Sequence, residues 1–184
     1  MTKIEALLAH IQAIFPDKIL ADYCDSFTAA KIWIEDSEPA NKILAHVVLP
    51  ENLPEEKTFQ INNPANKEVV VLAVDGEGIV GKHHSSCDAA FFDEACFCLA
   101  EFKYNTTSTN PNSMKGRIRS GLKQLEASIK QLETVKIIQL GYKVEAYFGK
   151  PPVYPKINPR IQRKAVEFSN KYSITLKEEN SKTF

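Results

Sequence analysis

Apolar residues recur at helical spacing in three segments of the chain. The first segment follows Thr2 and carries Glu5 three positions later, a capping box that predicts a helix start. A second helix is predicted to begin at Asn112 or Ser113, and a third to run over Pro159–Tyr172. The predicted buried stripes are Ile4, Leu7, Leu8, Ile11 and Ile14; Ile118, Leu122, Leu125, Ile129 and Leu132; and Ile161, Ala165 and Phe168.

Short runs of β-branched or alternating apolar residues predict strands between these helices. A short helix is expected over Lys18–Tyr23, and Lys177–Phe184 is predicted to be a loose polar tail. This mixture predicts a single α/β domain over residues 1–184. The predicted strands are Ala29–Ile34, Ile43–Leu49, Thr58–Ile61, Val69–Val74, Ile79–Lys82, Val135–Leu140, Lys143–Phe148 and Ser173–Leu176.

Charged residues interrupt an apolar stretch between Ser86 and Tyr104. Asp88 lies in its first half, and Glu101 and Lys103 lie in its second half. Charged side chains are rare in apolar strands unless they are paired or bind a metal. Two carboxylates and an ammonium group at such a place can hold a divalent metal and activate a water molecule.

The acidic pair Asp93-Glu94 predicts a hairpin in this stretch. With these two as the turn residues, Phe92 faces Ala95 and Asp88 faces Leu99. Because side chains alternate between the faces of a strand, Asp88 then shares a face with three residues of the second strand: Leu99, Glu101 and Lys103. The other face holds Cys96, Cys98, Ala100 and Phe102, a set typical of packing.

Asp88, a gap of twelve residues and then Glu101-Phe102-Lys103 resemble the motif of the PD-(D/E)xK nuclease superfamily. The resemblance covers roughly residues 68–148, with Cys87 in place of the usual proline. It implies a restriction-endonuclease-like αβββαβ core with a mixed central sheet flanked by helices. The N-terminal helix and extra strands would precede the rest of this core, and a basic C-terminal helix would follow it.

The same resemblance implies the chemistry of the site. Asp88, Glu101 and Lys103 would be the catalytic residues, with Mg²⁺ or Mn²⁺ bound by the two carboxylates and the carbonyl of Phe102. The lysine would position or activate the attacking water. Gln124 on the long helix would support the site. Glu5 or Glu77 would complete the set of metal ligands, and the sequence does not favour one of these two over the other.

The formal net charge is zero, but the charge is unevenly distributed. Residues 1–101 hold seven Lys and Arg against seventeen Asp and Glu, and residues 102–184 hold sixteen against six. Lys115, Arg119 and Lys123 line up on one face of the second helix, and Lys115 and Arg117 near its start oppose the helix dipole. This pattern favours a nucleic-acid surface; the alternatives are an ordinary solvated face and halves that neutralise each other.

The four cysteines, Cys24, Cys87, Cys96 and Cys98, lack the spacing of a disulfide scaffold. With His83 and His84 they offer an alternative zinc site, although their spacing fits no standard zinc module. No signal peptide or membrane-length apolar run is visible, so we expect a cytoplasmic protein without a membrane segment.

These patterns favour metal-dependent hydrolysis of nucleic acid by a DNA endonuclease of restriction, repair or defence type. A homodimer would fit, since many members of this superfamily pair to cut both strands. One alternative is a catalytically degenerate nucleic-acid-binding or protein-interaction module, in which Lys103 forms only a structural ion pair with Asp88 or Glu101. Another is an immunity-type protein whose acidic half masks a basic partner.

Overall fold

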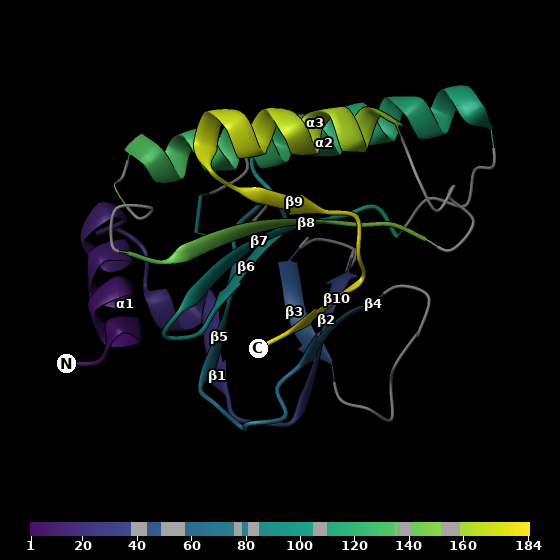
Figure 1. Ribbon diagram of the computed structural model, residues 1–184. Coiled ribbons are helices and arrows are strands. Elements are labelled where there is room, and N and C mark those ends of the chain that lie inside the picture. Colours follow the sequence, from purple (N-terminus) through teal and green to yellow (C-terminus); the bar gives the residue numbers. More distant parts are fainter. Residues whose placement is uncertain are drawn as a thin grey trace.

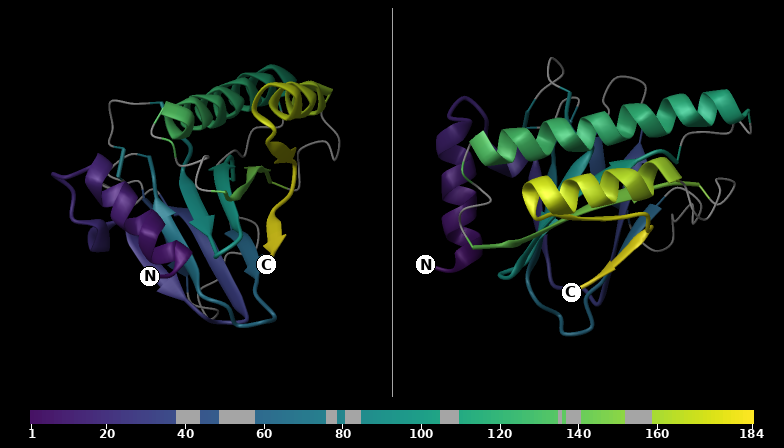
Figure 2. Two further views of the ribbon diagram at one scale, coloured as in Figure 1. Left: turned by 60° about the vertical axis from the view of Figure 1, so that its left-hand side comes forward. Right: turned by 45° about the horizontal axis from the view of Figure 1, so that its top comes forward.

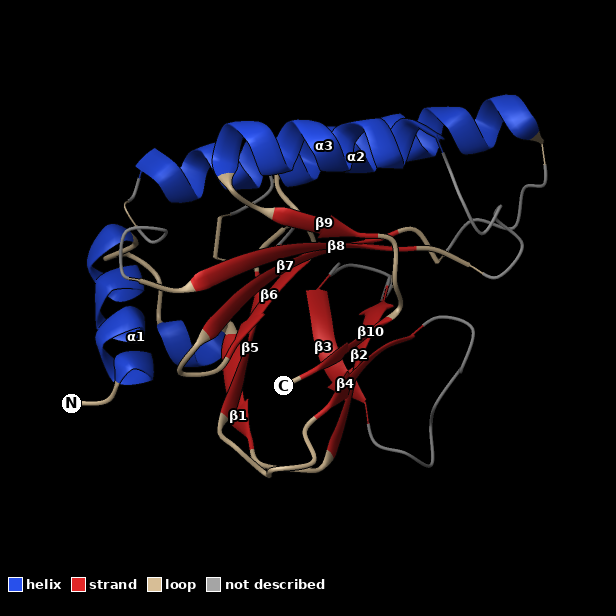
Figure 3. Cartoon of the chain, viewed as in Figure 1, coloured by secondary structure: helices blue, strands red, loops and turns tan. Residues whose placement is uncertain are grey.

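The computed structural model describes residues 1–37, 44–48, 58–75, 79–80, 85–104, 110–134, 136, 141–151 and 159–184. Within these ranges the chain forms three α-helices, one 3₁₀-helix and two sheets (Figure 1; Figure 3). The helices are α1 (Lys3–Ile14), η1 (Leu20–Asp22), α2 (Pro111–Thr134) and α3 (Pro159–Tyr172). The strands are β1 (Cys24–Phe27), β2 (Lys31–Ser37), β3 (Leu44–Val48), β4 (Thr58–Asn62), β5 (Val69–Ala73), β6 (Ala89–Phe92), β7 (Cys96–Phe102), β8 (Lys143–Gly149), β9 (Thr175–Lys177) and β10 (Ser181–Thr183).

The larger sheet has six strands in the order β1-β5-β6-β7-β8-β9. Neighbours from β1 to β7 are antiparallel, whereas β7, β8 and β9 are parallel. Helix α2 joins β7 to β8, and a helical crossover of this kind is what allows two consecutive strands to run parallel. The predicted α/β class with a mixed central sheet is therefore confirmed.

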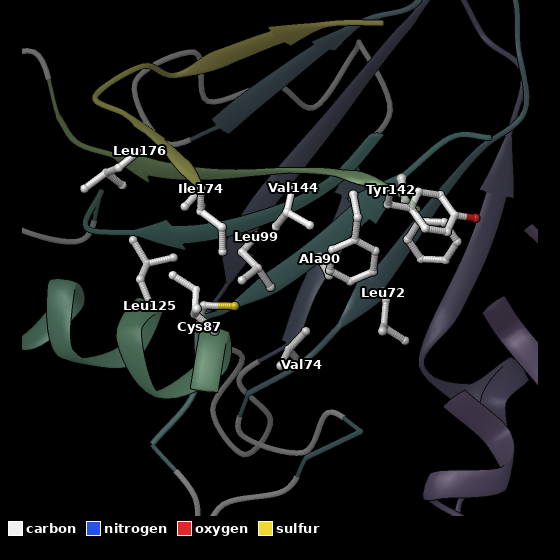
Figure 4. Close-up of a cluster of buried hydrophobic side chains, with 14 of the residues drawn as sticks. Leu72, Val74, Cys87, Ala90, Leu99, Leu125, Tyr142, Val144, Ile174 and Leu176 are labelled. Carbon is white, nitrogen blue, oxygen red and sulfur yellow. The ribbon is translucent and has the colours of Figure 1, made fainter. Parts of the chain in front are cut away.

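The large sheet is buried on both faces. Helices α2 and α3 lie side by side over one face, and α1 contributes to the same apolar layer (Figure 2). In Figure 4, Leu125 of α2 and Leu99 of β7 point into this layer. The smaller sheet, ordered β10-β4-β2-β3, packs on the opposite face, where Phe59 contacts Phe91 with ring centroids 5.3 Å apart.

The three predicted helices are present, and local sequence explains their ends. Thr2 and Glu5 form the predicted capping box of α1, and α3 has the predicted bounds. Helix α2 begins slightly earlier than predicted because Asn110, rather than Asn112 or Ser113, accepts the free N–H groups of the first turn.

The predicted turn of the β6–β7 hairpin is wrong. Phe92 pairs with Phe97 rather than Ala95, because the Asp93 carboxylate accepts the N–H groups of Ala95 and Cys96 at 2.9 and 2.8 Å and widens the turn. The register moves by two residues, so every side chain keeps its predicted face.

Other local expectations differ from the structure or lie outside the described residues. The short helix expected over Lys18–Tyr23 is present as the 3₁₀-helix η1, whereas β1, which pairs with β5, was not predicted. The return strand expected over Ile79–Lys82 is absent from the described residues, which form a bend at 79–80, so the hairpin begins only at β6. The strand expected over Val135–Leu140 lies outside the described residues, apart from a turn at Lys136.

The predicted loose tail is also wrong, because the chain end forms a strand. Strand β10 pairs in parallel with β4, and the ring of Phe184 packs edge-on against Phe91 at 6.2 Å between centroids. Lys182 of β10 reaches into the molecule and donates to the carboxylate of Glu145 at 2.9 Å.

Glu145 is the centre of a buried charge network that joins the last three strands. Its carboxylate is 1% exposed and receives Lys143 of β8 at 2.7 Å and Lys177 of β9 at 3.3 Å, in addition to Lys182. The Tyr147 hydroxyl donates to it at 2.6 Å. Burial alone would raise the pKa of Glu145, but these hydrogen bonds and positive charges hold that pKa well below its usual range.

No helix within the described ranges is both long enough and apolar enough to span a membrane.

We expect Glu145→Gln to lower the free energy of unfolding by about 3 kcal/mol at pH 7, because it leaves three lysines around a neutral side chain. The wild-type advantage should be complete above the ordinary glutamate pKa and should shrink as the pH falls toward the lowered pKa. Urea unfolding across a pH series measures both effects. The exposed Glu133→Gln is the matched control, and equal losses in the two variants would contradict the network.

Candidate functional site

The β6–β7 hairpin brings two carboxylates together at its open end. Asp88 immediately precedes β6, and Glu101 lies in β7, so the pairing of Ala89 with Ala100 sets the two acidic residues next to each other. The backbone N–H of Phe102 donates to Asp88 Oδ2 at 2.5 Å and orients that carboxylate.

Lys103 and Gln124 complete the predicted cluster. The Lys103 ammonium donates to Glu101 Oε1 and, at 3.3 Å, to Gln124 Oε1. Gln124 projects from α2 and donates its amide N–H to the carbonyl of Ser86 at 3.1 Å. The glutamine thus connects the ammonium group to the chain just before Asp88.

A third carboxylate, Asp75, belongs to this neighbourhood and was not among the predicted site residues. It follows the end of β5, and its Oδ1 accepts the Ser86 hydroxyl at 3.4 Å. In the sequence, Asp75 precedes Gly76, a pair typical of a turn. The position of Asp75, two residues beyond an apolar strand, could have identified it as a site residue, because side chains at adjacent strand ends lie close together.

Glu101 carries a strongly perturbed carboxylate. Its side chain is 0% exposed, and burial is the main reason why its pKa lies well above the usual range. The negative charges of Asp88 and, less strongly, Asp75 raise this pKa further, and Lys103 opposes them. Glu101 Oε2 is buried and accepts no hydrogen bond from the described residues, so this oxygen can still take a donor or a cation.

Helix α2 approaches the site closely because residue 121 is glycine. A Cβ atom at Gly121 would lie 2.6 Å from Phe148 Cε2, 3.0 Å from Glu101 Cγ and 3.1 Å from Lys103 Cε. The absence of a side chain at this position therefore allows the helix to cover the buried part of Glu101 and the stem of Lys103.

The structure does not place the side chains of two further predicted site residues, Glu5 and Phe102, beside Asp88 and Glu101. Glu5 caps α1, whose first N–H groups bond to Glu94 in the hairpin turn, at the opposite end of β6 from Asp88. Glu77 lies outside the described residues. The Phe102 ring packs in the second apolar cluster, so only its backbone is near the site.

The three predicted nucleic-acid contacts lie on exposed positions of α2. Arg119 and Lys123 line a hollow toward α3, and Lys115 is exposed one turn earlier. All three are thus on the molecular surface, while Gln124 of the same helix faces the site.

A second group of metal-ligand types lies on the other face of β7, where Cys96, Cys98 and Glu145 have ligand atoms within 4.8 Å of one another. Glu145 already bonds to three lysines, and burial raises the pKa of the Cys98 thiol well above its usual value. The histidines of the alternative zinc site, His83 and His84, lie outside the described residues. This group is therefore best explained as part of the ion-pair network.

No protein-family model matches this chain, and no curated protein or solved structure matches it either. The function must accordingly be argued from the geometry of its own residues.

We expect Gly121→Ala to destabilise the protein by about 1–3 kcal/mol, because the added methyl group overpacks a buried contact. Gly116→Ala on the same helix is the matched control, since its Cβ would meet nothing within 4 Å and should stabilise the helix by about 1 kcal/mol. Thermal unfolding of both variants tests this difference. A stabilised Gly121→Ala would show that α2 does not sit this close to β7.

We expect Glu101→Gln to stabilise the folded protein by about 1 kcal/mol near pH 8, because it removes a buried charge with an unpaired oxygen. The raised pKa of Glu101 means that wild-type stability is fully present at low pH and is lost as the pH rises through that pKa. The difference between variant and wild type should thus grow with pH in urea unfolding. A difference independent of pH would contradict the raised pKa.

Proposed function

We propose that this protein is a metal-dependent nuclease of the PD-(D/E)xK type, which hydrolyses phosphodiester bonds and has DNA as its favoured substrate. The observation that carries the proposal is the convergence of Asp88, Glu101 and Lys103 at one end of the β6–β7 hairpin. The order α1, β5, β6, β7, α2, β8 supports it, since the resemblance implies an αβββαβ order, although η1 and β1–β4 intervene between α1 and β5.

The donor set suits Mg²⁺ or Mn²⁺, since hard cations prefer carboxylate and carbonyl oxygens. Asp88 and Glu101 would hold the ion together with the Phe102 carbonyl, and Asp75 adds negative charge nearby. The unpaired, buried Glu101 Oε2 is the atom that most favours a metal at this place. When bound, the ion supplies charge stabilisation for the phosphate and a water molecule of lowered pKa.

Lys103 is the residue that we assign to the reacting phosphate. Its side chain is 17% exposed, whereas that of Glu101 is fully buried, so the ammonium group can reach a substrate at the surface. There it would orient the attacking water or stabilise negative charge on the phosphoryl oxygens. Gln124 acts through Lys103 by holding its ammonium group, and is therefore a positioning residue.

A polyanionic substrate is supported by the charge of the C-terminal half. Lys115, Arg119 and Lys123 are exposed on α2, the helix that also supplies Gln124 to the site. Phosphate contacts by such side chains would fix the position of a nucleic acid without reading its sequence. Restriction, repair or defence roles and a homodimer remain predictions.

The second candidate function is a degenerate nuclease-like module that binds nucleic acid or protein without cleavage. The ion pair between Lys103 and Glu101 favours it, because this contact already satisfies one carboxylate oxygen. The two candidates differ in metal binding. Mg²⁺ or Mn²⁺ should bind the nuclease with release of protons from Glu101, whose pKa is raised, and should not bind the degenerate module.

We expect the wild-type protein to cleave plasmid or single-stranded DNA with Mg²⁺ or Mn²⁺, and Lys103→Ala and Glu101→Gln each to lower the rate by about 100-fold or more. The exposed Lys31→Ala on β2 is the control for loss of a lysine and should cleave at the wild-type rate. Gel assays of cleavage and calorimetry of metal binding make the test.

Cleavage that persists in Lys103→Ala or in Glu101→Gln would exclude this site as its source. A wild-type protein that neither cleaves DNA nor binds the metals would favour the degenerate module.

A further inference from the structure

The outer sides of α2 and α3 form a hollow of about 400 Å³ whose walls are mostly basic. Its cations are Arg119 and Lys123 of α2 and Arg160, Arg163 and Lys164 of α3, and its anions are Glu126 and Glu167. We call these seven residues the interhelical groove. Five cations against two carboxylates leave an excess of three positive charges on one small surface.

The ion pairs inside the interhelical groove do not account for this excess. Lys164 bridges Glu126 and Glu167 at 2.8 Å each and so joins the two helices. This one lysine contacts both carboxylates of the groove, and Arg119 and Arg163 add positive charge beyond that pairing.

Helix stability does not explain these cations either. Helices α2 and α3 run in the same direction, so their N-terminal halves lie on the same side of the molecule (Figure 2). Neither helix has an acidic residue in its first turn, and α3 places Arg160 there, where the helix dipole is positive, whereas Arg119 and Lys123 lie more than two turns into α2. The positive N-terminus of α3 and the cations therefore add to one positive field, which a bound polyanion would relieve.

The interhelical groove is separate from the carboxylate site. Gly121 and Gln124 face β7 and Lys103, whereas Lys123 is rotated by about 200° from Gly121 around the helix axis at 100° per residue. The body of α2, about 10 Å across, thus stands between the groove and the carboxylates. A nucleic acid that touches both places must contact the groove with phosphates several nucleotides away from the bond that is cut.

We propose that the interhelical groove binds the sugar–phosphate backbone of the DNA substrate at a distance from the reacting phosphate. This inference rests on the proposed nuclease function for the identity of its ligand. It adds α3 to the nucleic-acid surface and predicts that long DNA binds better than short DNA, because only long DNA reaches both places.

The test is the affinity for fluorescent DNA duplexes of about 30 and 6 base pairs, measured by anisotropy in EDTA over a series of salt concentrations. We expect the double variant Arg119→Glu/Arg163→Glu to bind the long duplex at least about 10-fold more weakly at 0.1 M salt. The slope of log K against log[salt] should fall by about two, one for each lost phosphate contact. Affinity for the short duplex should change much less.

The control is Lys31→Glu/Lys136→Glu, which makes the same change in charge at two exposed positions outside the groove. Equal losses of affinity in the two double variants would overturn the inference, since only net charge would matter. Wild-type affinity in the groove variant, or no DNA binding by the wild-type protein, would overturn it as well. This binding test is independent of the nuclease test, because binding in EDTA involves neither metal nor cleavage. If the wild-type protein cleaves DNA and the groove variant binds DNA with wild-type affinity, only the inference about the groove is rejected.

Discussion

The buried charge of Glu101 is the constraint around which this end of the molecule is organised. It lies on the face of β7 that otherwise packs against α2, in a layer of apolar side chains. Burial and the nearby carboxylates oppose its ionisation, and Lys103 is the described cation that contacts it. Burying a charge with few partners lowers the free energy of unfolding, and strongly perturbed carboxylates of this kind are concentrated at functional sites. Gly121 lets α2 close over it, and Gln124 holds its counterion in place.

The buried carboxylates on the two faces of the large sheet differ in how fully they are paired. On the face toward the smaller sheet, Glu145 is bonded by three lysines and a tyrosine, so its charge is compensated and joins β8, β9 and β10. On the helix-covered face, Glu101 retains an unpaired oxygen beside Asp88. The charge of Glu145 is compensated by groups of the protein, whereas Glu101 has an oxygen that a cation from solution could bind. This contrast is the physical reason why we propose a functional site at Glu101 and assign a structural role to Glu145.

The fold places the acidic and basic parts of the chain on opposite sides of α2. The acidic N-terminal half contributes Asp75, Asp88 and Glu101 to the candidate site, and the basic C-terminal half contributes α2 and α3. The two sets meet across α2, with carboxylates beneath the helix and cations above it. A net charge of zero thus conceals two opposite local fields, one suited to a metal ion and the other to phosphates.

The sequence by itself determined the local features of this protein. Apolar periodicity and caps predicted the helices, and alternation along β7 predicted that Glu101 and Lys103 share a face with Asp88. These features depend on residues close together in the chain. Tertiary structure decided the role of Asp75 beside Ser86 and the ordered strand β10, and local hydrogen bonds to Asp93 that apolar alternation does not show decided the register of the hairpin. Each of these depends on contacts with a distant segment or on competition for backbone hydrogen bonds, which a linear pattern does not encode.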